Sequence, residues 1–597
     1  MSEESSSISV KYFVSRFMIL LAVSLTVGLG GFFSHALESH QAVACAVFIG
    51  LIMGTLFFWK FRLALAFLGL AVLIFTGSLD IPHFVQSSSL EVILFLVGMM
   101  VIVGALRDLG FFTWIVQLIV EMPNLSGMKF ITVTSVASAL LACAVDEVTS
   151  IIFISTLIFQ VCDRLKLNPT PYILIAVLAT NIGSSGTMMG NPVGIYIGTK
   201  GGLTFGDFML WSFPIMLVSL FSVVALLLFI FRKDLKKFDE SLQSRLAQGL
   251  SLAPRVKVPY KPGLILLVCT VCAIASHHPT EELLGLPKNT VLIVAPLVCS
   301  GIVMIIKQNR ARYYIEREVD WWTLIFFMLL FAVAGTLEYT EVDKVMASGF
   351  SRICGTSPYE LVPFIFFTSA VGSAFVDNVI FVAAFCPVIE QLSLSVKDFP
   401  LWWALLFGAC FGGNITMIGS TANIVALGML EKRPSASHVT FMKWLAVGLP
   451  ATLLSGVIVV GTLLLLEPSM ADRPADLNFA KVEKSTGREF CNKLATFEVA
   501  GVRAYDENGD GTVIPARAQL TGRTLEAGMN IVFAPKTEHV FATAYGKDGE
   551  AIVVAVPADF AMTDSPMVLT GCMYSVPLCD AKYPVLLVVK EAKPVKK

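Results

Sequence analysis

The chain contains two copies of a polar pattern that is set inside long apolar segments. In the first copy, Ala144-Val145-Asp146-Glu147-Val148-Thr149 is followed by a glycine-rich stretch from Asn181 to Pro192. In the second copy, Phe375-Val376-Asp377-Asn378-Val379 is followed by a similar stretch from Gly412 to Asn423. The acidic motifs lie 231 positions apart and the Thr-Met-x-Gly motifs lie 229 positions apart, so the two halves stay nearly in register. An internal repeat with polar breaks of this kind predicts a membrane transporter.

Composition supports a chain that lies mostly in lipid. Of its 597 residues 56% are hydrophobic and only 15% are charged, whereas soluble domains carry about 25% charged residues. The net charge of −1 gives no sign of nucleic-acid binding. The sequence also has no Gly-x-x-x-x-Gly-Lys-Ser/Thr motif, which argues against an ATP-driven motor within the chain. We therefore expect a transporter rather than an enzyme, with no cofactor and no nucleic-acid partner.

Eleven apolar segments are candidates for membrane spans, because a spanning helix needs about 20 predominantly apolar residues. They are Tyr12–Phe33, Gln41–Phe58, Leu63–Gly77, Leu90–Leu106, Pro171–Ile197, Phe208–Phe231, Pro262–Ser276, Thr290–Ile306, Trp321–Leu337, Leu401–Met429 and Val439–Leu466. The sequence thus predicts an all-α polytopic membrane protein with about eleven spans, the first of them retained within an N-terminal segment of residues 1–40.

Two further pairs of apolar arms flank the acidic motifs. Phe130–Val145 and Ser150–Leu165 flank the first motif, and Leu361–Phe375 and Ile380–Leu394 flank the second. An arm of about 16 residues reaches roughly 24 Å as a helix, which is less than the hydrocarbon thickness of about 30 Å. Each pair is therefore predicted to form a re-entrant hairpin with its polar tip near the middle of the membrane.

Basic residues predict the orientation, because they accumulate in short cytoplasmic loops. Residues 232–262 hold eight Lys or Arg residues against three acidic ones and are expected to form a cytoplasmic linker. Eleven spans then place the N-terminus in the cytoplasm of a cell (inner) membrane and the C-terminus outside it. Residues 41–231 and 263–466 form the two transporter repeats, and with five spans in each repeat the second is inverted relative to the first.

The chain changes character at residue 467. From there to residue 597 the apolar runs are short, as in 552–556 and 585–589, and Gly, Pro and Asp turns separate them. This pattern predicts a β-rich soluble domain. With the orientation given above, that domain is extracytoplasmic.

The acidic side chains in the motifs are the first candidates for a binding site. An ionisable residue at the centre of a membrane helix costs roughly 2.5 to 3.5 kcal/mol, so one that is kept there usually faces a cavity, a partner or an ion. Asp146, Glu147 and Asp377 meet this description, and Thr149 and Asn378 add neutral oxygen atoms. The alternative is that Asp146 and Asp377 only cap the helices that follow them.

The glycine-rich stretches are expected to break two helices and to complete the site. Glycine tolerates open backbone geometry and Pro192 cannot donate a hydrogen bond, so the helices should unwind there and offer carbonyl groups and positive dipole ends to ions. The alternative is that each glycine only allows close helix packing. The predicted ion-binding or substrate-binding residues are Asp146, Glu147, Thr149, Asn181, Gly183, Ser184, Ser185, Thr187, Asn191, Asp377, Asn378, Asn414, Thr416, Ser420, Thr421 and Asn423. Among them, Asp146, Asn181, Asp377 and Asn414 are the candidates for binding Na⁺.

Together these motifs resemble the repeat signatures of the ion transporter superfamily. Asp146-Glu147-Val148-Thr149 with Asn181–Pro192, and Val376-Asp377-Asn378-Val379 with Gly412–Gly419, are most similar to those of arsenite permeases and of P-protein-like and citrate-transporter-like permeases. The similarity covers roughly residues 41–466 and implies two inverted repeats, each with one hairpin and one broken helix. A homodimer is the assembly that this resemblance implies. Two positions depart from the family pattern: Glu147 stands where such permeases commonly have Asn, and Asn191 stands where they commonly have Asp.

The leading hypothesis is a secondary active transporter that works by alternating access and couples a small ion to Na⁺ or H⁺. Three acidic groups and no Lys or Arg lie in the motifs, which favours sodium/proton antiport. A Na⁺-coupled or H⁺-coupled anion permease for arsenite, citrate or a dicarboxylate is the alternative, because helix dipoles can bind anions without a basic side chain. A membrane sensor with a permease-like fold is a hypothesis of another class, and the intact pair of motifs argues against it.

Overall fold

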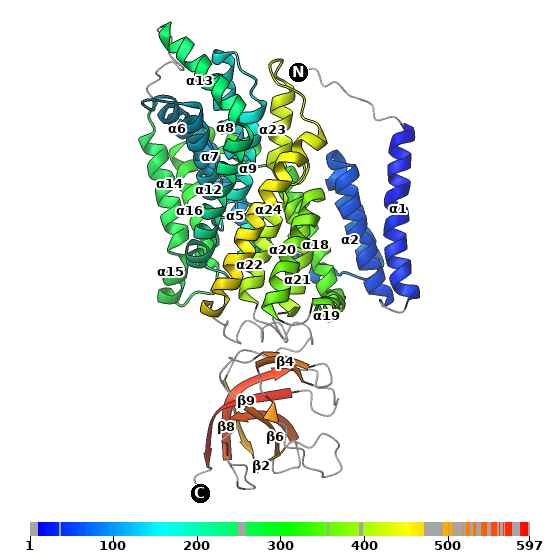
Figure 1. The fold of residues 1–597 in the computed structure, drawn as a ribbon. Coiled ribbons are helices and arrows are strands. Elements are labelled where there is room, and N and C mark those ends of the chain that lie inside the picture. The colour runs from blue at the N-terminus through cyan, green and yellow to red at the C-terminus, as the bar shows by residue number, and fades with distance from the viewer. Residues whose placement is uncertain are drawn as a thin grey trace. The chain divides into compact units, whose positions relative to one another are not determined.

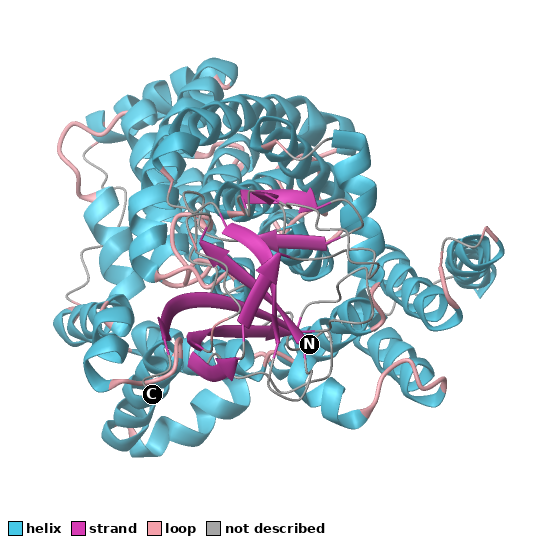
Figure 2. Ribbon diagram, turned by 90° about the horizontal axis from the view of Figure 1, so that it is seen from below, coloured by secondary structure: helices cyan, strands magenta, loops and turns pink. Residues whose placement is uncertain are grey.

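The computed structural model describes residues 10–34, 37–248, 258–354, 357–392 and 398–470, and after these the strands β1 to β9 with residues 560 and 565. The chain divides into two compact units. One comprises Met1–Val345, Val362–Pro387 and Trp402–Leu465, and the other comprises Met346–Leu361, Val388–Leu401 and Leu466–Lys597. Within the described residues, helices form the chain up to residue 469 and strands follow it (Figures 1 and 2).

The helices occur in two series, one for each half of the sequence. The first series is α1 (Val10–Phe33), α2 (Ser39–Phe57), α3 (Arg62–Phe75), α4 (Ile81–Ser87), α5 (Leu90–Asp108), α6 (Phe111–Val120), α7 (Gly127–Ala144), α8 (Glu147–Leu165), α9 (Thr170–Gly183), α10 (Pro192–Lys200), α11 (Phe205–Asp207), α12 (Phe213–Ile230) and α13 (Arg232–Ala247). The second series is α14 (Lys261–Ala275), α15 (His277–Leu284), α16 (Thr290–Ile306), α17 (Gln308–Tyr313), α18 (Trp321–Tyr339), α19 (Val342–Cys354), α20 (Pro358–Phe375), α21 (Asn378–Leu392), α22 (Phe399–Gly412), α23 (Thr421–Glu431) and α24 (Phe441–Leu466). Short 3-10 or π turns are η1 (Trp59–Phe61), η2 (Phe208–Ser212), η3 (Tyr314–Glu318) and η4 (Glu467–Ser469).

The number of long apolar helices is smaller than the sequence predicted. Among the described residues, eight helices are long and apolar enough to cross a membrane, or nine if the bent pair α14 and α15 forms one span. The prediction of about eleven spans included α3, which has 14 residues, α16, which has 17, and two helices that break into short halves. The chain is thus a multi-pass membrane protein with fewer uninterrupted spans than expected.

The internal repeat is present in the helices themselves. α5 and α18 have 19 residues each, α7 and α20 have 18 each, and α9 and α22 have 14 each. Their first residues lie 231, 231 and 229 positions apart, which are the offsets of the sequence motifs. Each half therefore uses the same order of helices around its acidic motif.

The acidic motifs lie at the turns of two helix pairs, as expected, but the arms are longer than the sequence indicated. α7 has 18 residues and α8 has 19, and both are long enough to cross a membrane. The arms of the first half are therefore not too short to span, contrary to expectation, since helix α7 begins at Gly127 and α8 begins at Glu147, directly after the tip. In Figure 1 helix α8 lies near the top of the bundle, whereas α20 and α21 lie lower.

The glycine-rich stretches do break their helices, and at equivalent places. α9 ends at Gly183 and α22 ends at Gly412, and the next helices begin after residues 191 and 420. A Cβ atom at Gly183 would lie 2.3 Å from Cα of Ala139, and one at Gly412 would lie 2.5 Å from Cα of Ala370. These glycines are therefore required for the close approach of each broken helix to the first arm of its hairpin.

Threonine hydroxyl groups form equivalent hydrogen bonds at the two helix breaks. Thr187 donates to the backbone carbonyl of Cys143, and Thr416 donates to that of Ala374. Each carbonyl lies near the last turn of the first arm, where helical carbonyl groups lack intrahelical partners. The Thr-Met-x-Gly motif thus ties each broken helix to the end of its own hairpin arm.

The segment between the halves is more ordered than a linker. Its first part is helix α13, which packs against α7, α8 and α9. Asp239 accepts a hydrogen bond of 2.6 Å from the backbone N–H of Gly127, and Arg245 donates one of 3.0 Å to the carbonyl of Arg164. Helix α13 therefore holds the outer ends of both arms of the first hairpin.

The second unit contains the strands. They are β1 (Leu494–Val499), β2 (Gly501–Ala504), β3 (Arg517–Ala518), β4 (Thr521–Leu525), β5 (Met529–Val532), β6 (His539–Tyr545), β7 (Ala551–Pro557), β8 (Met567–Ser575) and β9 (Val585–Pro594). A seven-stranded sheet has the order β1-β8-β9-β7-β6-β2 with β3 beside β6, and β4 pairs with β5. The segments 552–556 and 585–589, predicted as strands, lie in β7 and β9. That these strands form a soluble, extracytoplasmic domain stays a prediction.

Candidate functional site

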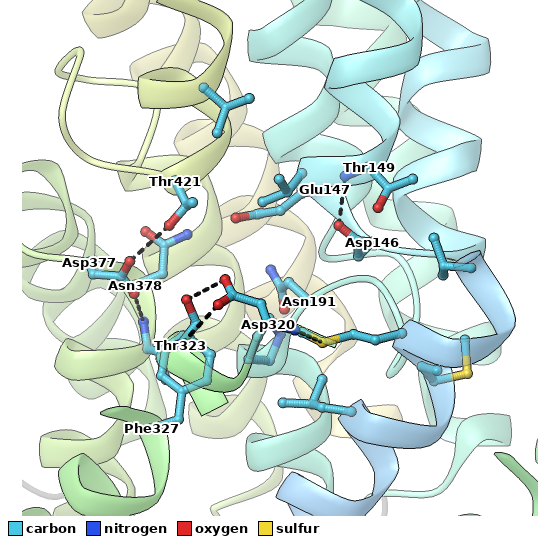
Figure 3. A pocket seen from close by; sticks show the side chains of 18 of the residues that line it. Asp146, Glu147, Thr149, Asn191, Asp320, Thr323, Phe327, Asp377, Asn378 and Thr421 are labelled. Atoms are coloured by element: carbon cyan, nitrogen blue, oxygen red, sulfur yellow. Dashed lines mark hydrogen bonds between the residues drawn. The ribbon is translucent and has the colours of Figure 1, made fainter. Parts of the chain in front are cut away.

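The tips of both helix pairs line one cavity of about 580 Å³ in the first unit. Its lining comes from the turn between α7 and α8, the turn between α20 and α21, the starts of α10 and α23, and the helices α3, α5 and α18 with the turns η1 and η3. Figure 3 shows the acidic residues Asp146, Glu147, Asp320 and Asp377 around this cavity. A cavity of this size suits a small molecule.

The first tip brings two carboxylates to the cavity. Asp146 is the N-cap of α8, and its Oδ1 accepts a hydrogen bond of 2.7 Å from the backbone N–H of Thr149. Glu147 points away from that helix end, toward Thr421 and Asp377 (Figure 3). Its Oε1 lies 3.3 Å from Oγ of Ser420, and its buried Oε2 has no hydrogen-bond partner among the described residues. Glu147 therefore has an oxygen atom free for a ligand or a proton.

The second tip carries one carboxylate with more hydrogen bonds. Oδ1 of Asp377 accepts from the backbone N–H of Val379 at 3.0 Å, and Oδ2 accepts from the hydroxyl of Thr421 at 3.1 Å. Asn378 accepts a hydrogen bond of 2.6 Å from Ser373. Asp146 and Asp377 thus cap the helices that follow them and also line the cavity, so the two interpretations do not exclude each other.

A cluster of amides joins the two halves behind the cavity. Nδ2 of Asn181 donates to Oδ1 of Asn414 and to Oδ1 of Asn423, both at 2.8 Å. Ser420 lies 3.1 Å from Oδ1 of Asn181 and is its donor. Asn423 in turn donates to the carbonyls of Gly413 and Thr416 at 2.7 and 3.0 Å. Both N–H groups of Asn181 are therefore used to connect α9 of the first half with the broken helix of the second.

Four helix N-termini meet at the cavity. Besides α8 and α21, α10 begins after Asn191, whose Oδ1 accepts from the N–H of Gly194 at 2.8 Å, and α23 begins after Ser420, whose Oγ accepts from the N–H of Ala422 at 3.1 Å. Helix N-termini carry partial positive charge. The cavity therefore offers positive backbone ends as well as carboxylates.

The predicted site residues fall into two groups. Those that line the cavity are Asp146, Glu147, Thr149, Asn191, Asp377, Asn378 and Thr421. Those that are buried around the helix breaks without lining it are Asn181, Gly183, Ser184, Ser185, Thr187, Asn414, Thr416, Ser420 and Asn423. The four Na⁺ candidates are divided in the same way, since Asp146 and Asp377 line the cavity whereas Asn181 and Asn414 hydrogen-bond to each other. Within the described residues, no three His, Cys, Asp or Glu side chains lie close enough together to hold a metal ion.

Sequence reasoning missed the charged residues outside the motifs. The cavity is also lined by Lys60, Arg62, Arg107, Glu318 and Asp320. Arg107 and Glu318 form an ion pair of 2.9 Å. Asp320 caps α18 through Thr323, with hydrogen bonds of 3.2 Å to its N–H and 2.7 Å to its hydroxyl. These charges stand at or beside the ends of apolar segments and belong to no repeated motif, so the motif pattern did not identify them.

Comparisons of this sequence with known proteins give a family model and several relatives. A family model described as "Citrate transporter" matches residues 48–350 and again 282–555, so the match extends beyond the limit of residue 466 that the sequence motifs indicated. A protein of Mycobacterium tuberculosis described as an uncharacterized transporter is 31% identical over 377 residues, which are 62% of this chain and 84% of that protein. The P protein of Mus musculus is 25% identical over 504 residues, which are 72% of this chain and 60% of that protein.

A solved structure is also similar to this chain. It is the YdaH transporter of Alcanivorax borkumensis, with a TM-score of 0.45 and 17% sequence identity. The similarity covers 67% of this chain and 89% of that one.

Proposed function

The chain belongs to the citrate transporter family, and on this premise we propose that it carries a small anion together with Na⁺ or H⁺ by alternating access of its two repeats. The observation that carries the proposal is the cavity at which Asp146, Glu147 and Asp377 meet from both halves. A site built from two repeats can open to either side when one repeat moves against the other.

The charges of the cavity support coupling of an anion to cations. Its lining has five acidic residues, Asp146, Glu147, Glu318, Asp320 and Asp377, and three basic ones, Lys60, Arg62 and Arg107. With all groups ionised the lining therefore carries two negative charges in excess. An anion would enter this cavity at a high electrostatic cost unless cations entered with it. Coupling to Na⁺ or H⁺ would supply those cations.

Sodium/proton antiport is the second candidate, and the same excess of acidic groups favours it. Antiport was favoured in part because the motifs contain no Lys or Arg, and the basic residues of the cavity weaken that support. Three basic side chains line the cavity although none belongs to a motif. Citrate is the first anion to test, since the family model is described by that substrate.

Transport by the full-length protein in proteoliposomes tests the proposal. We expect labelled citrate to accumulate when an inward Na⁺ or proton gradient is imposed, and to leak out when an ionophore removes the gradient. Antiport would instead appear as dissipation of a pH gradient on adding Na⁺ without any anion. A membrane sensor would show neither flux.

We further propose that both helix pairs are re-entrant, that the N-terminus is cytoplasmic and that residues 467–597 form an extracytoplasmic domain. The basic segment that begins with α13 supports a cytoplasmic face at that point. An alkaline phosphatase fused after residue 597 should be active, since this reporter folds only outside the cytoplasm of bacteria. An inactive fusion at normal expression would contradict the orientation.

A further inference from the structure

Arg62 is a buried arginine that no sequence motif includes. It is the first residue of α3, lines the cavity and is 5% exposed. Asp377 and Asp320 line the same cavity. A guanidinium in such a place requires a reason, because burying a charge costs several kcal/mol unless a partner compensates it.

Few of the hydrogen-bond donors of Arg62 are used. One Nη donates to the hydroxyl of Thr323 at 3.0 Å, whereas the buried Nε has no partner among the described residues. An arginine has five N–H groups in a planar fork that fits a carboxylate. Within the described part of the protein, most N–H groups of Arg62 therefore have no hydrogen-bond acceptor.

Other arginines near the cavity or at the ends of its helices are paired with carboxylates. Arg107 lies 2.9 Å from Glu318, Arg433 lies 2.9 Å from Asp163, and Arg310 lies 3.3 Å from Asp108. In the described residues no carboxylate oxygen lies within 4.0 Å of the Arg62 guanidinium. Its charge thus lacks the direct ion pair that its neighbours have.

The guanidinium is nevertheless held in a fixed place. It lies 4.0 Å from the ring centre of Trp59 and 4.9 Å from that of Phe326. Thr323, which accepts its hydrogen bond, is itself held by Asp320 at 2.7 Å. Aromatic rings stack on guanidinium groups without satisfying their N–H donors. The result is a positioned positive charge that still needs an acceptor.

We propose that Arg62 binds the transported anion, and that a carboxylate group of the substrate docks on its guanidinium. This inference rests on the proposed function and deepens it by assigning the anion to a residue outside both repeat motifs. It also divides the cavity into two parts. Arg62 and the Trp59 ring hold the anion, whereas Asp146, Glu147 and Asp377 remain available for the coupling cations.

A structural role is the competing explanation. Arg62 could serve only to balance the charges of Asp377 and Asp320 across the cavity. Because the charge of a cavity residue also changes the electrostatic cost of anion entry, a residue that only balances charge would raise KM for the anion when the charge is removed but not when Lys replaces it. A residue whose guanidinium fork binds the substrate carboxylate must instead raise KM in Arg62→Lys as well.

The test compares Arg62→Gln, Arg62→Lys and Arg433→Gln with the wild type, each as the full-length protein in proteoliposomes with labelled citrate. Arg433 is the matched control because its guanidinium also stacks on a ring, that of Phe159 at 4.7 Å, but it lies outside the cavity lining. We expect Arg62→Gln to raise KM by at least about tenfold, since hydrogen bonds to charged groups contribute roughly 1.5 to 3 kcal/mol. Arg62→Lys keeps the charge but loses the planar fork and should give an intermediate KM.

The outcomes separate this inference from the proposed function. An unchanged KM in Arg62→Gln, with the control also normal, would overturn the role of Arg62 while citrate uptake by the wild type upholds the function. No anion uptake by the wild type would overturn the proposed function, and this inference with it. If Arg62→Gln fails to fold, as judged by thermal unfolding, Arg62→Lys decides, and a wild-type KM in that variant would overturn docking on the guanidinium fork.

Discussion

The two repeats have the same backbone frame but different charges at their tips. Asp146 and Asp377 occupy equivalent positions, and each accepts a hydrogen bond from the start of the helix that follows. The next residue differs. Glu147 carries a second charge, and one of its oxygen atoms has no hydrogen-bond partner in the described part of the chain, whereas Asn378 is neutral and accepts a hydrogen bond from Ser373.

This difference indicates that the residues that shape the site are distinct from the residues that bind the ligand. Features common to both repeats, such as the breaks after Gly183 and Gly412, fix the positions of the helix ends. Features found in one repeat only, such as Glu147 and Arg62, then give the cavity its unequal charges. The site is therefore symmetric in frame and asymmetric in chemistry.

Removing either equivalent carboxylate should have the largest effect. Asp146→Asn and Asp377→Asn should each lower gradient-driven citrate uptake by about 100-fold, if each loss removes roughly 3 kcal/mol of interaction with a coupling cation. Initial rates in proteoliposomes measure this, with Asp163→Asn at a surface ion pair as the control. If uptake survives either substitution, these carboxylates are not required for transport, and the two repeats contribute only their common backbone arrangement.

Moving the extra charge from one repeat to the other should have the next largest effect. Glu147→Asn alone should lower uptake by at least about tenfold, since it removes a cavity carboxylate. Adding Asn378→Glu restores the net charge but places it beside Ser373 instead of Ser420, so we expect no recovery. Full recovery in the double variant would mean that the position of the charge is unimportant and that the repeats are interchangeable.

Substitution of the equivalent glycines should affect stability, and by similar amounts. Gly183→Ala and Gly412→Ala each force a Cβ against an alanine Cα at 2.3 and 2.5 Å, and overpacking of this kind typically costs about 1 to 3 kcal/mol. Thermal unfolding of the purified protein in detergent measures the loss. Gly301→Ala is the control, because among the described residues a Cβ at that position would have no atom within 4 Å other than those of its chain neighbours and its own helix backbone. A loss in only one of the two variants would show that the frames differ.

The smallest effect is expected from the equivalent threonines. Thr187→Val and Thr416→Val each remove one buried hydrogen bond to a hairpin carbonyl. Each should lower stability by about 0.5 to 1.5 kcal/mol, which is the net contribution of a typical intramolecular hydrogen bond. Thermal unfolding measures these losses as well. Clearly different losses in the two variants would show that the two repeats are not equivalent at this position.

Much of the frame could be predicted from the sequence, because glycine, acid and threonine at a constant offset act through local backbone geometry. The breaks at Gly183 and Gly412 and the place of Asp146 and Asp377 in one cavity follow from that pattern. The arms of the first hairpin were misjudged, since apolar content alone did not show that α7 begins at Gly127 and that α8 begins directly at Glu147. The number of long, uninterrupted apolar helices was overestimated for a related reason, because α3 and α16 are apolar but short.

The chemistry of the cavity was harder to predict. Arg62 lies 84 positions before Asp146 and 315 before Asp377, and no local pattern connects it with either. Only the fold brings α3 to the hairpin tips. In the same way, the hydrogen bonds of Asn181 with Asn414 and Asn423 join the two halves and leave these amides outside the cavity lining. Their residue types and positions indicated that these amides are polar and buried, but not that they form hydrogen bonds with one another.

The central claim is that both tips serve one transport site, and the double variant Asp146→Asn/Asp377→Asn tests it most directly. Groups that act as one unit lose function together, so their effects do not add. We predict that citrate uptake by the double variant is no lower than that of the weaker single variant. Two losses that multiply, so that the double variant falls by the product of both, would mean that the carboxylates act at separate sites.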